Sequence, residues 1–181
     1  MWGGVRARGR EGERERGREW VRRHLPRGEW LGIHLRNGGD WDRACEHTQS
    51  SQNLFSSPQC LGYRNEYGSL TTSLCMPDTD TIMEMVRRKI KSLRAVAVFV
   101  ASDNDHMISQ FREQFRDEPV SFYKQEEDNP LLDLVILGQS SHFIGNCVSS
   151  FSAFVKRERD VSGLPSSFWA LPDMQTKKME L

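Results

Sequence analysis

The stretch AVAVFVAS, residues 95–102, contains the longest apolar run in the chain. It is rich in β-branched valine and apolar at successive positions, so both faces of an extended strand would be hydrophobic. A strand with two apolar faces is typical of a parallel sheet, because helices cover both faces of such a sheet. The stretch therefore predicts a central strand of a parallel α/β sheet.

Helical patterns flank this run on both sides. Before it, apolar residues recur at helical spacing from about residue 80 to residue 94, and Asp78 or Asp80 is placed to cap that helix. After it, a second apolar helical face lies within residues 108–115. The acidic cluster DND at residues 103–105 fits a pair of metal-ligating carboxylates, but helix capping explains it more simply. We expect it to cap the second helix.

The same alternation continues in both directions. Helices are expected to begin at Asn129, with Pro130 in the first helical position, and at Ser149 or Ser150. Three further stretches are candidate strands: WLGIHL at 30–35, PVSFYK at 119–124 and SHFIGN at 141–146. Strands that alternate with helices form parallel βαβ units. The sequence therefore predicts an α/β fold with a Rossmann-like, doubly wound parallel sheet.

The N-terminal segment differs in composition. Residues 1–29 are rich in arginine, glycine and glutamate and have little apolar periodicity, so we expect them to be disordered or, at most, a frayed charged helix. An arginine-rich arm for nucleic acid or anionic lipid is the alternative, which the interleaved glutamates disfavour. The segment has no apolar stretch of the kind found in a secretory signal peptide. We expect one domain at residues 30–172 and a tail at residues 173–181.

Charge and hydropathy disfavour two broad classes. The 181 residues include 25 Lys plus Arg and 25 Asp plus Glu, a formal net charge of zero. A general nucleic-acid binder neutralises phosphates with an excess of positive charge, so this balance disfavours one. No apolar run approaches the ~20 residues that a membrane-spanning helix requires.

Four cysteines are dispersed along the chain, none in a C-x-x-C pair, so the spacing of a zinc ribbon or redox pair is missing. They fit two disulfides in an oxidising compartment, and the alternative is four free buried cysteines in a cytosolic domain. Three of them lie within residues 45–76, a long segment with little periodicity. A loop of this length in a compact domain requires a structural or functional reason.

Two segments carry the candidate binding chemistry, because open α/β sheets bind ligands beyond the carboxyl ends of their strands. The segment HLRNGGD, residues 34–40, combines an arginine fork that suits phosphate with glycines that allow close backbone approach. The segment GNCVSSF, residues 145–151, leads from a strand into a helix, where free N–H groups and serine hydroxyls favour an anion. Together they predict a diphosphate site.

Each candidate residue also has a structural explanation. Arg36 is typical of a surface ion pair, His34 of a hydrogen-bonded core histidine, the serines of helix N-caps and the phenylalanines of a core. No G-x-G-x-x-G, P-loop or H-E-x-x-H motif is present, so the usual dinucleotide, Walker-type and zinc-protease sites find no support.

Four stretches occur in the order of one known family: GIHLRNGGDWDRAC, SPQCLGY, DLVILGQSSHFIGNCVSSFSAFVKRERDVSGLPSSFW and the C-terminal KMEL. From about residue 30 to residue 181 the chain resembles the C-terminal half of the GDP-fucose protein O-fucosyltransferases, type 1, that modify epidermal-growth-factor-like (EGF-like) repeats. The resemblance implies the C-terminal, donor-binding domain of a GT-B-type glycosyltransferase. It also implies transfer of L-fucose from GDP-fucose to a Ser or Thr hydroxyl, with inversion, in the endoplasmic reticulum.

The resemblance implies roles for individual residues. His34, Leu35 and Arg36 match the family's His-Leu-Arg motif, in which the arginine is the catalytic residue that holds the β-phosphate. GDP-fucose contacts are implied for these three residues and for three more: Asp133, Ser150 and Phe151.

The resemblance further implies two disulfides, Cys45–Cys75 and Cys60–Cys147. It implies GDP-fucose as the donor substrate, no required cofactor and no metal-ligating residue, and leaves open whether a metal assists. The implied acceptors are EGF-like repeats of secreted and cell-surface proteins such as Notch receptors, with no nucleic acid and no membrane span.

The chain also departs from the family's pattern. The family's N-terminal domain has no counterpart and residues 1–29 do not resemble it, so we expect a truncated form. The alternatives to an active enzyme are a non-catalytic fragment that binds GDP or GDP-fucose and a fragment that does not fold stably alone. KMEL differs from KDEL at its second position, and we expect a weaker retrieval signal for the endoplasmic reticulum lumen.

Overall fold

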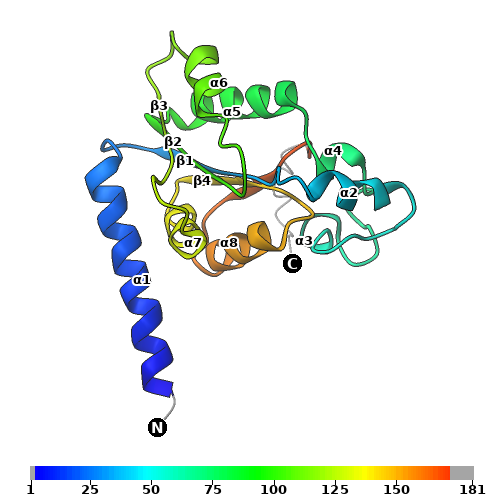
Figure 1. Ribbon diagram of the computed structural model, residues 1–181, viewed down its shortest axis with the longest axis horizontal. Helices are drawn as coiled ribbons and strands as arrows, with labels where there is room; N and C mark the ends of the chain where they lie inside the picture. The colour runs from blue at the N-terminus through cyan, green and yellow to red at the C-terminus, as the bar shows by residue number, and fades with distance from the viewer. Residues whose placement is uncertain (1–2, 172–181) are drawn as a thin grey trace, which may run out of the picture.

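A five-stranded parallel sheet forms the centre of the molecule (Figure 1). The computed structural model describes residues 3–171, with side chains from residue 11 onward. The predicted Rossmann-like, doubly wound sheet is confirmed, with the strand order β3-β2-β1-β4-β5. The strands are β1 (Trp30–Leu35), β2 (Ala97–Ser102), β3 (Ser121–Tyr123), β4 (His142–Gly145) and β5 (Ser166–Phe168).

This strand order creates a switch point between β1 and β4. From β1 the chain proceeds to β2 and β3 on one side of the sheet, and then crosses to β4 and β5 on the other. In open α/β sheets, ligands usually bind at such a switch point, where the connections that follow two neighbouring strands lead toward opposite edges of the sheet. The loops after β1 and β4 contain the two segments that the sequence analysis selects as the candidate binding site.

Strand β2 is buried on both faces, as its sequence predicts. Val98 and Val100 belong to the core cluster on the side of α5 and α6, whereas Ala97 and Phe99 belong to the cluster on the side of α7 and α8. Figure 1 shows the first helix pair above the sheet and the second pair below it. The four helices are α5 (Thr79–Leu93), α6 (Ile108–Gln114), α7 (Pro130–Gly138) and α8 (Ser150–Val161).

The predicted helix caps are confirmed at three positions. Asp78, Asn129 and Ser149 each accept a hydrogen bond from a backbone N–H in the first turn of the helix that follows. Helix α6 differs, because it begins after Met107 without a side-chain cap. The expectation that the acidic cluster at residues 103–105 caps this helix is wrong, since Asp103 bonds instead to the loop after β1.

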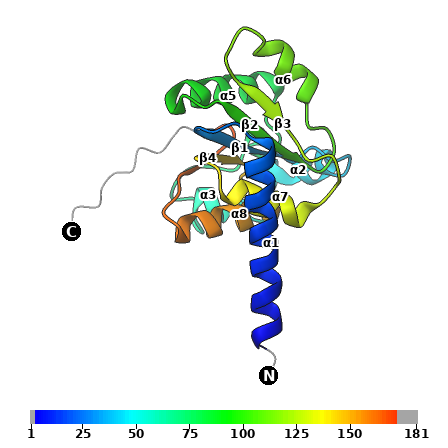
Figure 2. The ribbon, with the colours of Figure 1, turned by 90° about the vertical axis from the view of Figure 1, so that its left-hand side faces the viewer.

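Helix α1 (Gly3–His24) occupies most of the segment that we expect to be disordered or, at most, a frayed charged helix. Trp20 and Leu25 pack into the core cluster below the sheet, and Gly17 lies so close to Val135 of α7 that a Cβ there would collide with it. Figure 2 shows α1 alongside α7, with its N-terminal part extending away from the sheet. The structure differs from the expectation because α1 has a short apolar face among its charged residues, and this face packs against α7.

The long segment between β1 and α5 is built from short helices. We call residues 41–76 the cysteine-rich segment. Two disulfides, Cys45–Cys75 and Cys60–Cys147, have the pairing that the resemblance implies. The first ties the start of the segment to its end, and the second ties its middle to the loop after β4. Its elements are α2 (Trp41–Glu46), the 3-10 turn η1 (His47–Gln49), α3 (Pro58–Leu61) and α4 (Thr72–Cys75).

A buried arginine joins the last elements of the sheet. Arg159 of α8 is fully buried, and its guanidinium donates to the carbonyls of Leu137, Ser140 and Pro165 at 3.0, 2.8 and 2.8 Å. These carbonyls belong to the end of α7, the connection to β4 and the connection to β5. Burial lowers the pKa of Arg159 to about 10, so it stays positively charged at neutral pH, as suits the C-terminal end of a helix.

Candidate functional site

The site begins at the end of β1, with His34, Leu35 and the residue that follows, Arg36. Leu35 is buried in the core on the side of α5, whereas His34, 3% exposed, faces α8. The Nδ1 atom of His34 lies 2.8 Å from Oγ of Ser152, and its ring centroid lies 4.5 Å from that of Phe151. The first turn of α8 therefore packs directly against the end of β1.

His34 is held in its neutral form. Ser152 Oγ accepts the backbone N–H of Asn146 at 2.9 Å, so its hydroxyl proton is free to be donated to Nδ1 of His34. Burial and, secondarily, the charge of Arg36 lower the pKa of His34 to about 3. A histidine with this pKa is neutral at physiological pH and is a poor proton acceptor.

Arg36 lies between two carboxylates. Its guanidinium pairs with Asp103, and its Nη2 atom lies 3.0 Å from Oδ2 of Asp40. Its Cζ atom lies 4.5 Å from the ring centroid of Trp41, a cation–π contact. The side chain of Arg36 is 21% exposed and that of Asp40 is 75% exposed. Arg36 is thus a partly buried, oriented cation, and one of its two ionic partners is open to solvent.

Asp103 is the residue of the candidate site that sequence reasoning missed. Leu35 of β1 pairs with Ser102 of β2, so the residues that follow them, Arg36 and Asp103, come side by side. The carboxylate of Asp103 also accepts the backbone N–H groups of the two residues after Arg36, at 2.9 and 3.1 Å. The signal for this role is the register of the two strands, which local sequence patterns do not contain.

The two glycines of this turn differ in their surroundings. A Cβ at Gly38 would collide with the carboxylate of Asp103 and the guanidinium of Arg36. Around Gly39, in the described part of the chain, there is room for a side chain. Close packing therefore requires glycine at position 38 and not at position 39.

The second half of the site is the turn from β4 into α8. Asn146 is fully buried, and its Oδ1 atom accepts the N–H groups of Val148 at 2.9 Å and Ser149 at 3.2 Å. Ser149 caps α8, Ser150 is exposed and Phe151 is half-buried. The first N–H groups of a helix have no partner within the helix, and this turn presents them at the carboxyl edge of the sheet.

Asp133 lies in the first turn of α7 and is 7% exposed. Its Oδ1 atom accepts a hydrogen bond of 2.5 Å from Nε2 of Gln125, in the loop after β3. Burial raises the pKa of Asp133 to about 6. The carboxylate therefore faces the β3 side of the sheet, whereas the other site residues gather at β1 and β4. Gln125 is a partner that the sequence analysis did not include.

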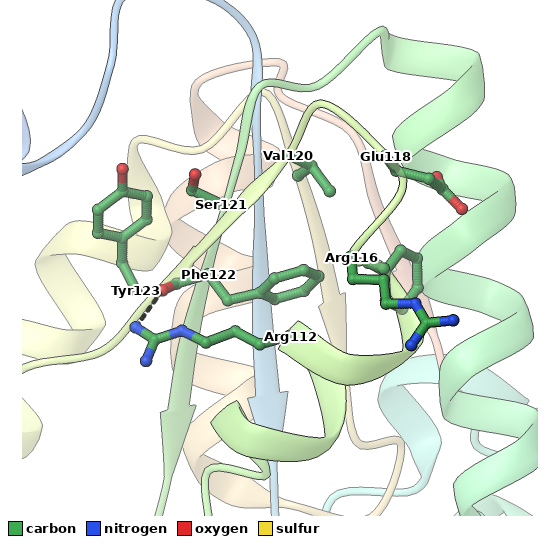
Figure 3. Close-up of a pocket in the computed structure, with 8 residues that line it drawn as sticks. Arg112, Arg116, Glu118, Val120, Ser121, Phe122 and Tyr123 are labelled. Atoms are coloured by element: carbon green, nitrogen blue, oxygen red, sulfur yellow. Dashed lines mark hydrogen bonds between the residues drawn. The ribbon is translucent and has the colours of Figure 1, made fainter.

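Two hollows lie on other parts of the surface. One, of about 330 Å³, is lined by residues 104–110 and Lys124, beside the loop after β2. The other, of about 310 Å³, follows the edge strand β3, where Arg112 donates to the carbonyl of Phe122 at 3.5 Å (Figure 3). Neither hollow is lined by a residue that the sequence analysis assigns to the site.

Two further properties of the described residues concern metal binding and membrane insertion. Among their side chains, no group of three or more His, Cys, Asp or Glu is arranged to hold a metal ion. None of their helices is long and apolar enough to cross a membrane.

A family model described as GDP-fucose protein O-fucosyltransferase matches residues 12–162, which include both segments of the site. The chain belongs to this family. The match begins within α1, so the similarity to the O-fucosyltransferases starts well before residue 30. The resemblance, which the sequence analysis places from about residue 30, therefore begins earlier, at residue 12.

Individual O-fucosyltransferases are closely similar to the chain. GDP-fucose protein O-fucosyltransferase 1 of Caenorhabditis elegans is 43% identical over 147 residues, which cover 78% of this chain and 38% of the relative. A crystal structure of POFUT1 in complex with GDP-fucose is 40% identical with a TM-score of 0.83, and covers 88% of this chain and 47% of that chain. A crystal structure of POFUT1 in complex with GDP has the same identity and TM-score, with 88% and 46% covered. The chain spans less than half the length of these relatives.

Proposed function

We propose that this chain provides the donor-binding part of a protein O-fucosyltransferase that transfers L-fucose from GDP-fucose to Ser or Thr of EGF-like repeats, with inversion. One observation carries the proposal: Arg36 and the first turn of α8 follow the two strands that flank the switch point of the sheet. Both suit a diphosphate. The crystal structures of POFUT1 with GDP and with GDP-fucose support the assignment.

In this proposal Arg36 is the catalytic residue. When the bond between fucose C1 and the β-phosphate oxygen breaks, its electron pair passes to that oxygen, and the guanidinium stabilises the resulting charge. The acceptor hydroxyl attacks C1 from the opposite face, which inverts the configuration at C1, and its proton is released to water. The diphosphate displaces the exposed Asp40, while Asp103 keeps Arg36 and its turn in place.

The other residues of the proposed donor site have supporting roles. His34 is enclosed by Ser152 and Phe151 and has a pKa of about 3, so we assign it to holding α8 against β1 and to contacting the donor, and not to accepting the hydroxyl proton. Further contacts with GDP-fucose are assigned to four residues: Leu35, Asp133, Ser150 and Phe151.

The proposed compartment is the endoplasmic reticulum lumen. Two disulfides favour an oxidising compartment. KMEL, residues 178–181, is proposed as the retrieval signal, and it lies in the tail outside the described residues. The proposed acceptors are EGF-like repeats of secreted and cell-surface proteins such as Notch receptors, and no cofactor besides the donor substrate is invoked.

A second candidate function is a non-catalytic fragment that binds GDP or GDP-fucose. The observation that favours it is the span of the similarity, which covers 38% of the Caenorhabditis elegans relative and 47% of the POFUT1 chain with GDP-fucose. A transferase gains much of its rate from holding donor and acceptor in the right orientation, an effect that can reach ~7–11 kcal/mol. A chain that holds the donor without the acceptor forfeits this effect.

Two measurements separate these functions. Calorimetric titration with GDP tests the donor site, and transfer of radiolabelled fucose from GDP-fucose to a folded EGF-like repeat tests the reaction. We expect weak GDP binding and no measurable transfer by the 181-residue chain, and transfer by a chain extended with the N-terminal domain of a relative. Transfer by the short chain at a rate near that of the long one would show a complete enzyme. Absence of GDP binding in both chains would contradict the donor site.

A further inference from the structure

Asn146 is connected to Arg36 through a single backbone carbonyl. Its side-chain Nδ2 atom donates to the carbonyl of Cys75 at 2.6 Å. The same carbonyl accepts the Nε1–H group of Trp41 at 2.9 Å. The Trp41 ring in turn stacks with the guanidinium of Arg36 at 4.5 Å. The carbonyl of Cys75 therefore joins the turn before α8 to the ring that supports Arg36.

A second connection runs through the backbone of Asn146. Its N–H group donates to Oγ of Ser152 at 2.9 Å, and that hydroxyl bonds to Nδ1 of His34 at 2.8 Å. His34 lies two residues before Arg36 in the chain. Asn146 thus reaches the Arg36 segment from two sides, through the end of β1 and through the start of α2.

The members of this junction are buried and satisfied. Asn146 and Cys75 are fully buried, and Trp41 is 5% exposed. Both polar atoms of the Asn146 side chain have partners, since Oδ1 accepts the N–H groups of Val148 and Ser149 while Nδ2 donates to Cys75. A satisfied polar network in the interior is rigid, and loss of one member leaves the others unpaired. The Cys45–Cys75 disulfide also anchors the residue that carries the shared carbonyl.

We propose that Asn146 is a positioning residue, which acts through the carbonyl of Cys75 to hold Arg36 and the first turn of α8 at the spacing that a diphosphate requires. The inference rests on the proposed donor function. Asn146 acts through its neighbours and does not contact the donor. It also gives the cysteine-rich segment a function, because that segment supplies both Trp41 and the shared carbonyl.

Two variants each remove one bond to this carbonyl. In Asn146→Asp, one oxygen still accepts the two N–H groups of the turn, but the other cannot donate to the carbonyl of Cys75 and repels it. Trp41→Phe removes the second donor and keeps a ring beside Arg36. Asn65→Asp is the matched control, because the Asn65 amide also donates to a backbone carbonyl, that of Gln52 at 3.0 Å, but is only partly buried and is not a member of the junction.

The first readout needs no ligand. In the ¹⁵N-labelled chain, the indole N–H resonance of Trp41 is identified by its loss in Trp41→Phe. We expect Asn146→Asp to shift this resonance and to speed its hydrogen exchange about tenfold. We also expect it to shift the Arg36 Nε–H resonance. Asn65→Asp should leave both resonances and the exchange rate unchanged. If Asn146→Asp folds and the Trp41 and Arg36 resonances are unchanged, the proposed connection between Asn146 and Arg36 is refuted. If Asn146→Asp does not fold, Trp41→Phe provides the test. We expect Trp41→Phe to shift the side-chain amide resonance of Asn146, and an unshifted resonance would refute the connection.

The second readout compares GDP with guanosine, which lacks phosphates. We expect Asn146→Asp to weaken GDP binding about tenfold and to leave guanosine binding unchanged. The double variant should bind GDP no more weakly than Asn146→Asp alone, because both changes act on one carbonyl. Additive losses, or equal losses for both ligands, overturn the positioning role. If the wild-type chain binds no GDP, the proposed function is contradicted instead. The NMR measurements without ligand then test on their own whether Asn146 is connected to Arg36.

Discussion

Asp103 and Arg36 follow neighbouring strands at the same level, and their side chains form an ion pair at the carboxyl edge of the sheet. The carboxylate also accepts two backbone N–H groups of the turn after Arg36. The register of β1 and β2 therefore sets the position of an otherwise flexible side chain. Such preorganisation is what stabilisation of a developing phosphate charge requires.

Replacing Asp103 by alanine should release both the guanidinium and the turn. We expect GDP binding to weaken about tenfold, ~1.4 kcal/mol, as measured by calorimetric titration. Asp103→Asn keeps an oxygen that accepts the turn's N–H groups, so it should lose less. Tighter binding by the alanine variant would show that the carboxylate blocks the site, contrary to the role proposed here.

Arg36→Lys tests whether charge alone is sufficient. Lysine keeps the positive charge but lacks the planar fork, so transfer by a chain that includes an N-terminal domain should fall by at least ~10²-fold. Arg36→Ala should abolish transfer. Circular dichroism should show an unchanged fold in both, and wild-type turnover by Arg36→Ala would remove this residue from the mechanism.

Asp133 should make stability depend on pH. Its pKa in the folded chain is about 6, against an ordinary value of 3.8, so the folded state binds the proton more tightly than the unfolded state. The contribution to stability is present below about pH 4 and is lost as pH rises through about 6. Asp133→Asn should therefore be about 3 kcal/mol more stable than wild type at pH 7.5 and close to it in stability at pH 4. Urea unfolding at both values measures this, and a difference that is the same at both would refute it.

The disulfides should contribute to stability and to the site. Cys45–Cys75 and Cys60–Cys147 link residues 30 and 87 positions apart, and loops of this size are worth roughly 3–5 kcal/mol each in the chain-entropy model. We expect serine replacement of either pair to lower the urea midpoint. Loss of the second pair should weaken GDP binding more, because Cys147 lies in the turn before α8. Peptide mapping that finds four free thiols in secretory-pathway material would contradict both bridges.

Two glycines of α1 provide a matched test of its docking. Alanine is favoured over glycine in a helix by ~1 kcal/mol, and a Cβ at Gly12 would meet no neighbour. Gly12→Ala should therefore stabilise the chain slightly. Gly17→Ala should destabilise it by ~1 kcal/mol, because the methyl group collides with Val135. Stabilisation by both changes would show that α1 does not pack on α7.

Features with a local cause could be predicted from the sequence. The two-faced strand β2 and the helix around Val86 follow from apolar periodicity, and the caps Asp78, Asn129 and Ser149 follow from side chains that bond within one helical turn. The two candidate binding loops follow from the general rule for open sheets, once the strands are identified.

Features with a tertiary cause could not. The apolar face of α1, which includes Trp20, is too short to stand out among charged residues until α7 covers it. Strand β5 has three residues and exists because it pairs with β4. The role of Asp103 depends on the register of two strands that lie far apart in the sequence.

The carbonyls that Arg159 binds come from the end of α7 and from the connections that lead to β4 and β5, and they surround the guanidinium only when α7, β4 and β5 are all in place. A partly assembled arrangement would bury a cation with unpaired donors, which costs several kcal/mol. Helix α8 and strand β5 therefore gain little by docking one at a time. We therefore expect α7, β4, α8 and β5, which carry half of the candidate site, to open and close as one cooperative unit.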